Sequence, residues 1–318
     1  MQTVSVARHA MATRFEILLH GENPAWLRAA GEEVLDEVDR LESQLSLYRP
    51  TSEIARVNWL AAREPVRVSP NVFRLLQHAK QLHEETGGAF DITIAPLVRC
   101  WGFMGGTGQF PEAEAIEAAR AKVGMKQIQL NADDCTVRFA QEGVMIDLGA
   151  IGKGYAVERA VELLRETGVS SALFHGGTST IYGLGHPPDS DCWKVALEYP
   201  HPEEEQKRAR HLATVALRDE ALSVSAIWGR SFVKEGKTFG HVLDPRSGQP
   251  VCGTLMTAVA LPSATETDAL STALLVSGEA GFETISNLRP KMRTLMLAET
   301  SDSPGTYNIL ARGLMPVN

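Results

Sequence analysis

The feature that most limits the fold of this chain is a long amphipathic segment near its start. Apolar side chains recur there at steps of three or four residues, the spacing of one face of an α-helix. Asn23 suits the N-cap and Pro24 the first helical position. The apolar positions are Leu27, Ala30, Val34, Val38, Leu41 and Leu45. Residues 13–19 alternate directly before it, so the chain is predicted to open with a half-buried strand and a long helix.

Further segments predict helices and strands in an irregular order. Helices are expected from Ser69-Pro70 onward and over residues 111–124 and 154–167, and Thr265 is the expected cap of one more, with Asp268 three residues later. The short β-rich runs are residues 128–130, 136–139, 144–147, 172–174, 195–197, 214–217 and 257–261. Because no regular βαβ rhythm appears, the pattern indicates an α+β fold rather than a doubly wound sheet.

Length and charge exclude some classes of protein. The chain has 318 residues, 44% of them hydrophobic, which is enough for one large core or two fused lobes. No clear linker divides it, so we expect a single domain over residues 1–318. A net charge of −8 argues against a general nucleic-acid binder, although not against a local basic pocket for phosphates.

The sequence shows no sign of membrane insertion or of paired cysteines. The first eight residues lack the apolar core of a signal peptide and no run of 18 apolar residues occurs, so we expect a cytoplasmic protein without a membrane span. The four cysteines form no C-x-x-C pair, which argues against a zinc site or a thioredoxin-type redox pair. Residues 200–210 are charge-rich and predict a solvated loop or an exposed helix.

Two glycine-rich segments are candidates for binding an anion. In residues 87–91 (GGAFD), paired glycines would let the backbone approach a ligand, although they also suit a helix C-cap followed by a strand. In residues 147–156 (DLGAIGKGYA), a helix is expected to begin near Lys153, and its N-terminus and the lysine both offer positive potential to a phosphate. The spacing matches neither a Walker A loop nor a G-x-G-x-x-G fingerprint.

Two further motifs carry groups suited to catalysis and to metal binding. His241 precedes an Asp244-Pro245 turn, where a histidine can act as a base near neutral pH or have a structural role. Asp268 and Thr272 are four residues apart, so their oxygens face the same side of a helix. Such an oxygen pair suits a hard cation such as Mg²⁺, and helix capping is the alternative.

Taken in order, these motifs resemble the ApbE family, the FAD:protein FMN transferases. The resemblance runs from about Met11 to about Gly278. It implies an α+β fold of mixed sheets with flanking helices, related to the T-fold, and an enzyme that moves FMN from FAD onto a hydroxyl of an acceptor flavoprotein. The matching blocks are residues 11–13, 45–58, 88–91, 147–154, 175–177, 241–245 and 268–272.

The resemblance also implies a site, residue by residue. Mg²⁺ would be bound by the side chains of Asp268 and Thr272 and by the backbone carbonyl of Ala150. A Thr or Ser hydroxyl of the acceptor would attack the FMN-side phosphorus of FAD, with AMP leaving and His241 as the candidate catalytic base. Tyr48 would offer its flat ring to the isoalloxazine, and Lys153 its charge to the pyrophosphate. The residues implied to contact FAD are Met11, Tyr48, Ala89, Phe90, Asp91, Asp147 and Lys153.

Three positions depart from the family pattern on the expected acceptor side. Thr178 stands where an Asp usually follows the paired glycines, Ala226 stands where a Gly is expected, and Trp228 is large enough to reshape the acceptor cleft. Two alternatives to the transferase therefore stay open. One is a Mg²⁺-dependent FAD pyrophosphatase that yields FMN and AMP, since its chemistry at phosphorus is the same, and the other is a non-catalytic FAD-binding protein.

Overall fold

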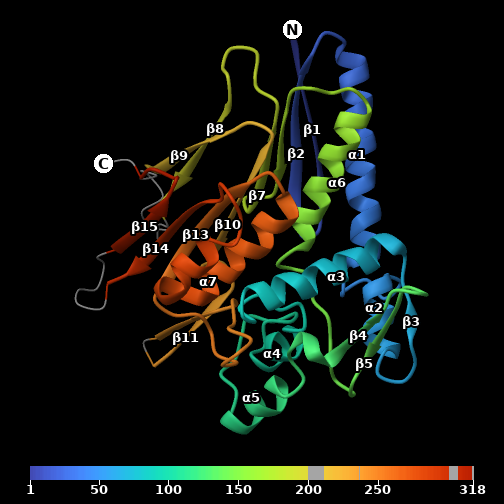
Figure 1. Cartoon of the computed structure of the whole chain (residues 1–318), viewed down its shortest axis with the longest axis vertical. Helices are drawn as coiled ribbons and strands as arrows, with labels where there is room; N and C mark the ends of the chain where they lie inside the picture. The colour runs from blue at the N-terminus through green and yellow to red at the C-terminus, as the bar shows by residue number, and fades with distance from the viewer. Residues whose placement is uncertain (200–210, 236, 301–306, 317–318) are drawn as a thin grey trace.

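An antiparallel sheet of eight strands forms the centre of the computed structural model, which describes residues 1–199, 211–235, 237–300 and 307–316 (Figure 1). The strand order is β1-β2-β6-β7-β10-β13-β14-β15. These strands are β1 (Gln2–Ala10), β2 (Thr13–Gly21), β6 (Ala172–Gly176), β7 (Thr180–Leu184), β10 (Glu220–Ala226), β13 (Thr254–Leu261), β14 (Arg293–Glu299) and β15 (Tyr307–Arg312). The sheet and its flanking helices confirm the α+β prediction, whereas the charged segment 200–210 lies outside the described residues.

Three helices cover one face of this sheet. α1 (Pro24–Leu45) lies against β1 and β2, α6 (Gly152–Glu166) against β6 and β7, and α7 (Ala264–Ser286) against β10, β13 and β14 (Figure 1). The predicted apolar face of α1 is buried along its whole length, and the Asn23 side chain accepts the N–H groups of Ala25 and Trp26 at 3.1 Å. None of the described helices is long and apolar enough to cross a membrane.

A two-stranded hairpin packs on the opposite face of the sheet. Its strands are β8 (Trp193–Glu198) and β9 (His211–Leu217), and their inward side chains form a second apolar core with β10, β13 and β14. Gly183 on β7 permits this contact, because a Cβ there would lie 2.9 Å from the ring of Trp193 and 3.0 Å from Cβ of Leu217. The hairpin therefore crosses the sheet at β7.

A group of smaller elements packs at the lower end of the main sheet in Figure 1. Trp101 is fully buried among them, stacks on Phe239 at 5.9 Å between ring centroids, and donates its Nε1–H to Gly248 O at 2.8 Å. These contacts hold the hairpin of residues 231–240 near the helix of residues 95–100. The elements are α2 (Glu53–Leu60), β3 (Val66–Arg67), α3 (Pro70–Glu85), α4 (Ala95–Cys100), α5 (Ala113–Arg120), β4 (Ile128–Asn131), β5 (Thr136–Phe139), β11 (Ser231–Lys234) and β12 (Lys237–Gly240).

The strand predicted over residues 144–147 is wrong, for a physical reason. This extended segment pairs with a side chain instead of with a neighbouring strand: Asn58 Oδ1 accepts the N–H of Ile146 at 2.7 Å, and Asn58 Nδ2 donates to Ile146 O at 2.9 Å. The N–H of Asp147 donates to Ile92 O at 2.7 Å. The backbone groups that a sheet would satisfy are thus satisfied by Asn58 of α2 and by the carbonyl of Ile92.

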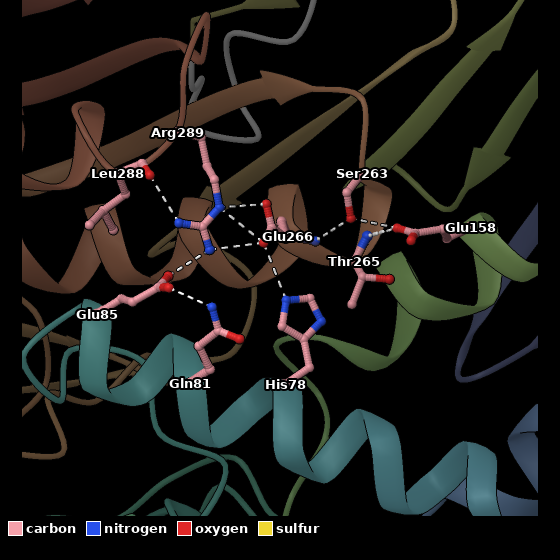
Figure 2. Close-up of polar contacts among 9 residues, drawn as sticks. All are labelled: His78, Gln81, Glu85, Glu158, Ser263, Thr265, Glu266, Leu288 and Arg289. Atoms are coloured by element: carbon pink, nitrogen blue, oxygen red, sulfur yellow. Dashed lines mark hydrogen bonds and ion pairs between the residues drawn. The ribbon is translucent and has the colours of Figure 1, made fainter.

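The start of α7 also differs from the prediction. Its cap is Ser263, whose Oγ accepts the N–H of Glu266 at 3.2 Å, and Thr265 lies inside the helix. The Glu266 carboxylate accepts from Arg289 Nε at 2.9 and 3.0 Å and contacts His78 Nε2 at 3.2 Å (Figure 2). This ionic network ties α3 to the beginning of α7 and to the segment that follows it.

Because of this network, the stability of the fold is expected to decrease at acid pH. Burial of Glu266 raises its pKa, but hydrogen bonds and charge from His78 and Arg289 outweigh this and lower the pKa from 4.5 to about 2. The resulting stabilisation, roughly 3 kcal/mol, is present above pH 4.5 and is lost as pH falls toward 2. We expect Glu266→Gln to lower the free energy of unfolding by about this amount at pH 7, with the difference from wild type shrinking below pH 4.5.

Urea unfolding at several pH values between 7 and 2 measures this difference. Glu33→Gln, on the exposed face of α1, is the matched control and should change little. A difference between Glu266→Gln and wild type that stays constant down to pH 2 would contradict the assigned role of the carboxylate.

Candidate active site

A cavity of about 1190 Å³ opens where the main sheet meets the smaller elements. It is lined by ten of the eleven site residues predicted from the sequence, although they lie far apart along the chain: Tyr48, Ala89, Phe90, Asp91, Asp147, Ala150, Lys153, His241, Asp268 and Thr272. Met11 is the exception. It lies in the β1–β2 turn with φ of 50°, packs against the main core, and leaves its neighbour Ala12 to line the cavity.

The turn before α6 presents a lysine and helix N–H groups to the cavity. Lys153 lies in the first turn of α6, and its Nζ donates to Gly149 O at 3.0 Å. The Asp147 carboxylate accepts the N–H of Gly149 at 2.8 Å, which closes the turn. Burial raises the pKa of Asp147, against the opposing effects of the Gly149 hydrogen bond and of the charges of Lys153 and Arg230. A phosphate placed here would meet positive potential from both the helix and the lysine.

Arg230 supplies a second cation that sequence reasoning missed. It lines the cavity in the loop between β10 and β11, and its Nη1 donates to Phe103 O at 3.4 Å. Among the described residues, no carboxylate lies within ion-pair distance of its guanidinium. Arg230 also acts on Tyr48, since its charge lowers the pKa of that hydroxyl. No motif in the sequence marks it, because its place in the site depends on how the β11–β12 hairpin folds back.

Two aromatic side chains are exposed at the cavity. Tyr48 follows α1 and is 60% exposed, and Trp228 is 43% exposed. Burial raises the pKa of the Tyr48 hydroxyl, and the charge of Asp147 adds to this, while Arg230 acts in the opposite direction. Both ring systems are thus accessible to a flat ligand. Thr178 and Ala226, the other two positions that depart from the family pattern, also line the cavity.

The GGAFD segment ends α3 and orders its own carboxylate. The N–H of Gly88 donates to His83 O at 2.9 Å, and Gly87 and Gly88 have φ of 58° and 78°, so the predicted helix end is confirmed. The strand expected after it is wrong, because residues 89–94 form bends and a turn. Asp91 Oδ1 accepts from the N–H of Thr93 at 2.7 Å, and Asp91 Oδ2 lies 3.1 Å from His83 Nδ1. Burial opposes a charged His83, but Asp91 outweighs it and raises the pKa of the imidazole. His83 was not among the predicted residues.

The predicted metal ligands lie together at the contact between α6 and α7. Asp268 is 4% exposed, and its Oδ2 accepts the N–H of Gly154 at 2.9 Å. Among the described residues, no cationic side chain pairs with this carboxylate, and a buried carboxylate is normally paired or bound to a metal. Thr272 Oγ1 lies 3.1 Å from Ser225 Oγ and 3.2 Å from Asp268 O.

The donor set of this site favours a hard cation. Its groups are a carboxylate, a hydroxyl and the Ala150 carbonyl, all of them oxygen ligands of the kind that Mg²⁺ prefers. Over the described parts of the chain, no cluster of three or more His, Cys, Asp or Glu residues forms a metal site of another kind. The residues present therefore fit Mg²⁺ by the chemistry of their donors.

His241 is arranged as a neutral base. Its Nδ1 lies 3.2 Å from Arg230 O, and because a carbonyl only accepts, Nδ1 carries the proton and Nε2 keeps its lone pair. Burial lowers the pKa of the imidazole; the Arg230 carbonyl opposes this, and the charges of Arg230 and Lys153 lower the pKa further. Asp244 does not orient the histidine, because its carboxylate is bound by Arg246 at 2.9 and 3.0 Å.

The chain is similar to known flavin transferases in sequence and in fold. An FAD:protein FMN transferase of Klebsiella pneumoniae is 31% identical over 259 residues, 79% of this chain and 71% of the relative, and one of Treponema pallidum is 30% identical over 288 residues, 86% and 78%. The solved flavin transferase ApbE of Vibrio cholerae superposes with a TM-score of 0.84 at 25% identity, over 98% of this chain and 97% of that one. The flavinyl transferase ApbE of Pseudomonas stutzeri gives 0.84 at 28% identity, over 98% and 95%. The model of the ApbE family matches residues 11–296, and the chain therefore belongs to the ApbE family.

Proposed function

We propose that this protein transfers FMN from FAD to a Ser or Thr hydroxyl of an acceptor protein, with Mg²⁺ bound and AMP released. The observation that carries the proposal is the meeting of three kinds of group in one cavity. These are the buried carboxylate of Asp268 and two cations, all without an ion-pair partner among the described residues, and a neutral histidine. Each matches one requirement of phosphoryl transfer: metal binding, charge neutralisation and proton removal.

Lys153 and Arg230 are suited to the diphosphate of FAD. They approach the cavity from the start of α6 and from the β10–β11 loop, so a diphosphate between them would be neutralised from two sides. Arg230 can donate two parallel hydrogen bonds, and Lys153 acts as a point charge. Tyr48 and Trp228 offer ring faces to the isoalloxazine or the adenine.

His241 would remove the proton from the incoming hydroxyl. Nε2 accepts that proton, the hydroxyl oxygen forms a bond to the FMN-side phosphorus, and the bond from this phosphorus to the bridging oxygen breaks, so that AMP leaves. Asp268, Thr272 and the Ala150 carbonyl would hold Mg²⁺, which neutralises charge on the diphosphate when bound. Gly154 and Ser225 keep the first two ligands in place through the hydrogen bonds described above.

Release of AMP from FAD by the purified protein tests the proposal. It is measured with Mg²⁺ and with EDTA, each in the presence and in the absence of proteins extracted from the source organism. We expect metal-dependent AMP release together with covalent flavin on an extract protein, seen as fluorescence in a denaturing gel. AMP release without covalent flavin would identify an FAD pyrophosphatase instead. Bound FAD with neither product would identify a binding protein.

The pH dependence of turnover reports on His241. Since burial lowers the pKa of this imidazole and the base must be unprotonated, we expect the acid limb of kcat/KM to lie below pH 6.5. His241→Gln should lower kcat by roughly 100-fold and remove this limb. His186→Gln, at an exposed position outside the cavity, should leave both unchanged. An acid limb that survives in His241→Gln would assign the base to another residue.

A further inference from the structure

Part of the cavity is used by none of the groups assigned above. It lies between the β8–β9 hairpin and the face of the main sheet on which that hairpin packs. Its floor is formed by Leu173, Ile181 and Val224. These apolar side chains are only partly buried, on β6, β7 and β10. The cations and aromatic rings suited to FAD lie on other elements: the turn after α1, the start of α6 and the β10–β11 loop.

The wall opposite this floor is the edge of β8. Five consecutive residues of this strand line the cavity, from Lys194 to Glu198. Side chains of a strand alternate between its two faces, so a cavity that lay over one face would meet only every second residue. Contact with all five indicates that the edge of the strand, with its main-chain groups, borders the cavity.

That edge has free hydrogen-bonding groups. Among the described strands, β8 pairs with β9 alone, in a sheet of two strands. In an antiparallel pair, the N–H and C=O groups of alternate residues point away from the partner strand. Over the described residues, no other segment donates to or accepts from the backbone of residues 194–198. A row of unpaired groups therefore faces an apolar floor inside the cavity where transfer would occur.

We propose that β8 binds the acceptor protein by strand addition, with an extended acceptor segment lying along this edge. Its main chain would pair with β8, and alternate side chains would rest on the floor, the arrangement by which sheet edges recognise peptides. The segment would thereby present its Ser or Thr hydroxyl to His241 in the same cavity. This inference rests on the proposed transferase function, because only a protein acceptor requires a site for a polypeptide.

Ile181→Lys tests the floor, and Ile309→Lys is its matched control. Both isoleucines are partly buried against the second core, but only Ile181 lines the cavity. With extract proteins as acceptor, we expect Ile181→Lys to lower covalent flavin labelling by about tenfold or more, while FAD affinity stays within about twofold of wild type. Ile309→Lys should label as wild type does, and thermal melting checks that both variants fold.

The backbone contact is tested on the acceptor. The labelled segment, identified by mass spectrometry from the wild-type reaction, is synthesised with single N-methyl groups at successive residues. Strand addition predicts that methylation at every second residue lowers labelling, since alternate N–H groups face β8. Labelling that is insensitive to methylation, or sensitive without alternation, would overturn strand addition.

The remaining outcomes separate this inference from the function on which it rests. Wild-type protein that labels no extract protein contradicts the transferase proposal itself. Wild-type labelling by Ile181→Lys overturns the docking site alone. Loss of FAD affinity in that variant equal to the loss of labelling would assign the floor to FAD. A wild-type dimer in sedimentation that Ile181→Lys dissociates would assign the β8 edge to a second copy of the chain.

Discussion

Replacing Asp268 with Asn is expected to remove metal-dependent AMP release while leaving the fold intact. The asparagine keeps an oxygen that can accept the N–H of Gly154, which the carboxylate now accepts at 2.9 Å, but it removes the negative charge that Mg²⁺ requires. Electrostatic stabilisation by a bound metal is worth several kcal/mol, so kcat should fall by roughly 100-fold or more. A coupled assay for AMP over a range of Mg²⁺ concentrations measures the loss.

Asp268→Ala separates the charge from the hydrogen bond. It removes both, so it should lose turnover as Asp268→Asn does and should also unfold at a lower temperature, because the Gly154 N–H is left buried without its partner. Binding of Mn²⁺, followed by electron paramagnetic resonance in the absence of FAD, gives a readout that does not depend on catalysis. Undiminished Mn²⁺ binding in Asp268→Asn would remove this residue from the metal site.

The elements predicted best are those whose sequence pattern lies within the element itself. α1 was predicted at its observed start because its cap and its apolar spacing both lie within the segment itself. Five of the eight strands of the main sheet were not predicted: β1, β7, β10, β14 and β15. The error at residues 144–147 has a similar cause, since an extended segment joins a sheet only if a strand lies beside it. Here the neighbour is Asn58, 88 residues earlier in the chain.

The residues of the candidate site also differ in whether a local motif could reveal them. Lys153 and Asp147 belong to one short motif, and Asp268 and Thr272 to one helix turn, so spacing alone could suggest their chemistry. Arg230 carries no such signal, because its place beside Tyr48, a residue far away in the sequence, is set by the fold. A cation is visible in a sequence, but whether a carboxylate neutralises it is decided by packing.

The backbone carbonyl of Ala150 shows a further limit of side-chain reasoning. It became a candidate ligand only through the family resemblance, since an apolar side chain gives no chemical reason to expect a metal. The structure places this residue in the cavity with Asp268 and Thr272. Its role as a ligand remains a prediction, which the Mn²⁺ measurement on the neighbouring carboxylate tests indirectly.

Gly154→Ala is expected to damage both the fold and the metal site, although it adds only one methyl group. A Cβ at this position would lie 2.2 Å from Ala264 O and 2.7 Å from Asp268 Cβ, so α6 and α7 would have to move apart. We expect the free energy of unfolding to fall by about 3 kcal/mol and the melting temperature by roughly 4–5 °C. Because the same residue donates its N–H to Asp268, the Mg²⁺ concentration for half-maximal turnover should also rise.

Gly152→Ala, in the same turn of α6, is the matched control. A Cβ there would meet only Leu148 Cβ at 3.8 Å, an ordinary contact, and alanine favours a helix more than glycine does. Its melting temperature and Mg²⁺ requirement should therefore stay at or near the wild-type values. Equal losses in both variants would mean that the helix start tolerates no side chain at all, whereas a loss confined to Gly154→Ala would show that close contact between α6 and α7 sets the position of the metal carboxylate.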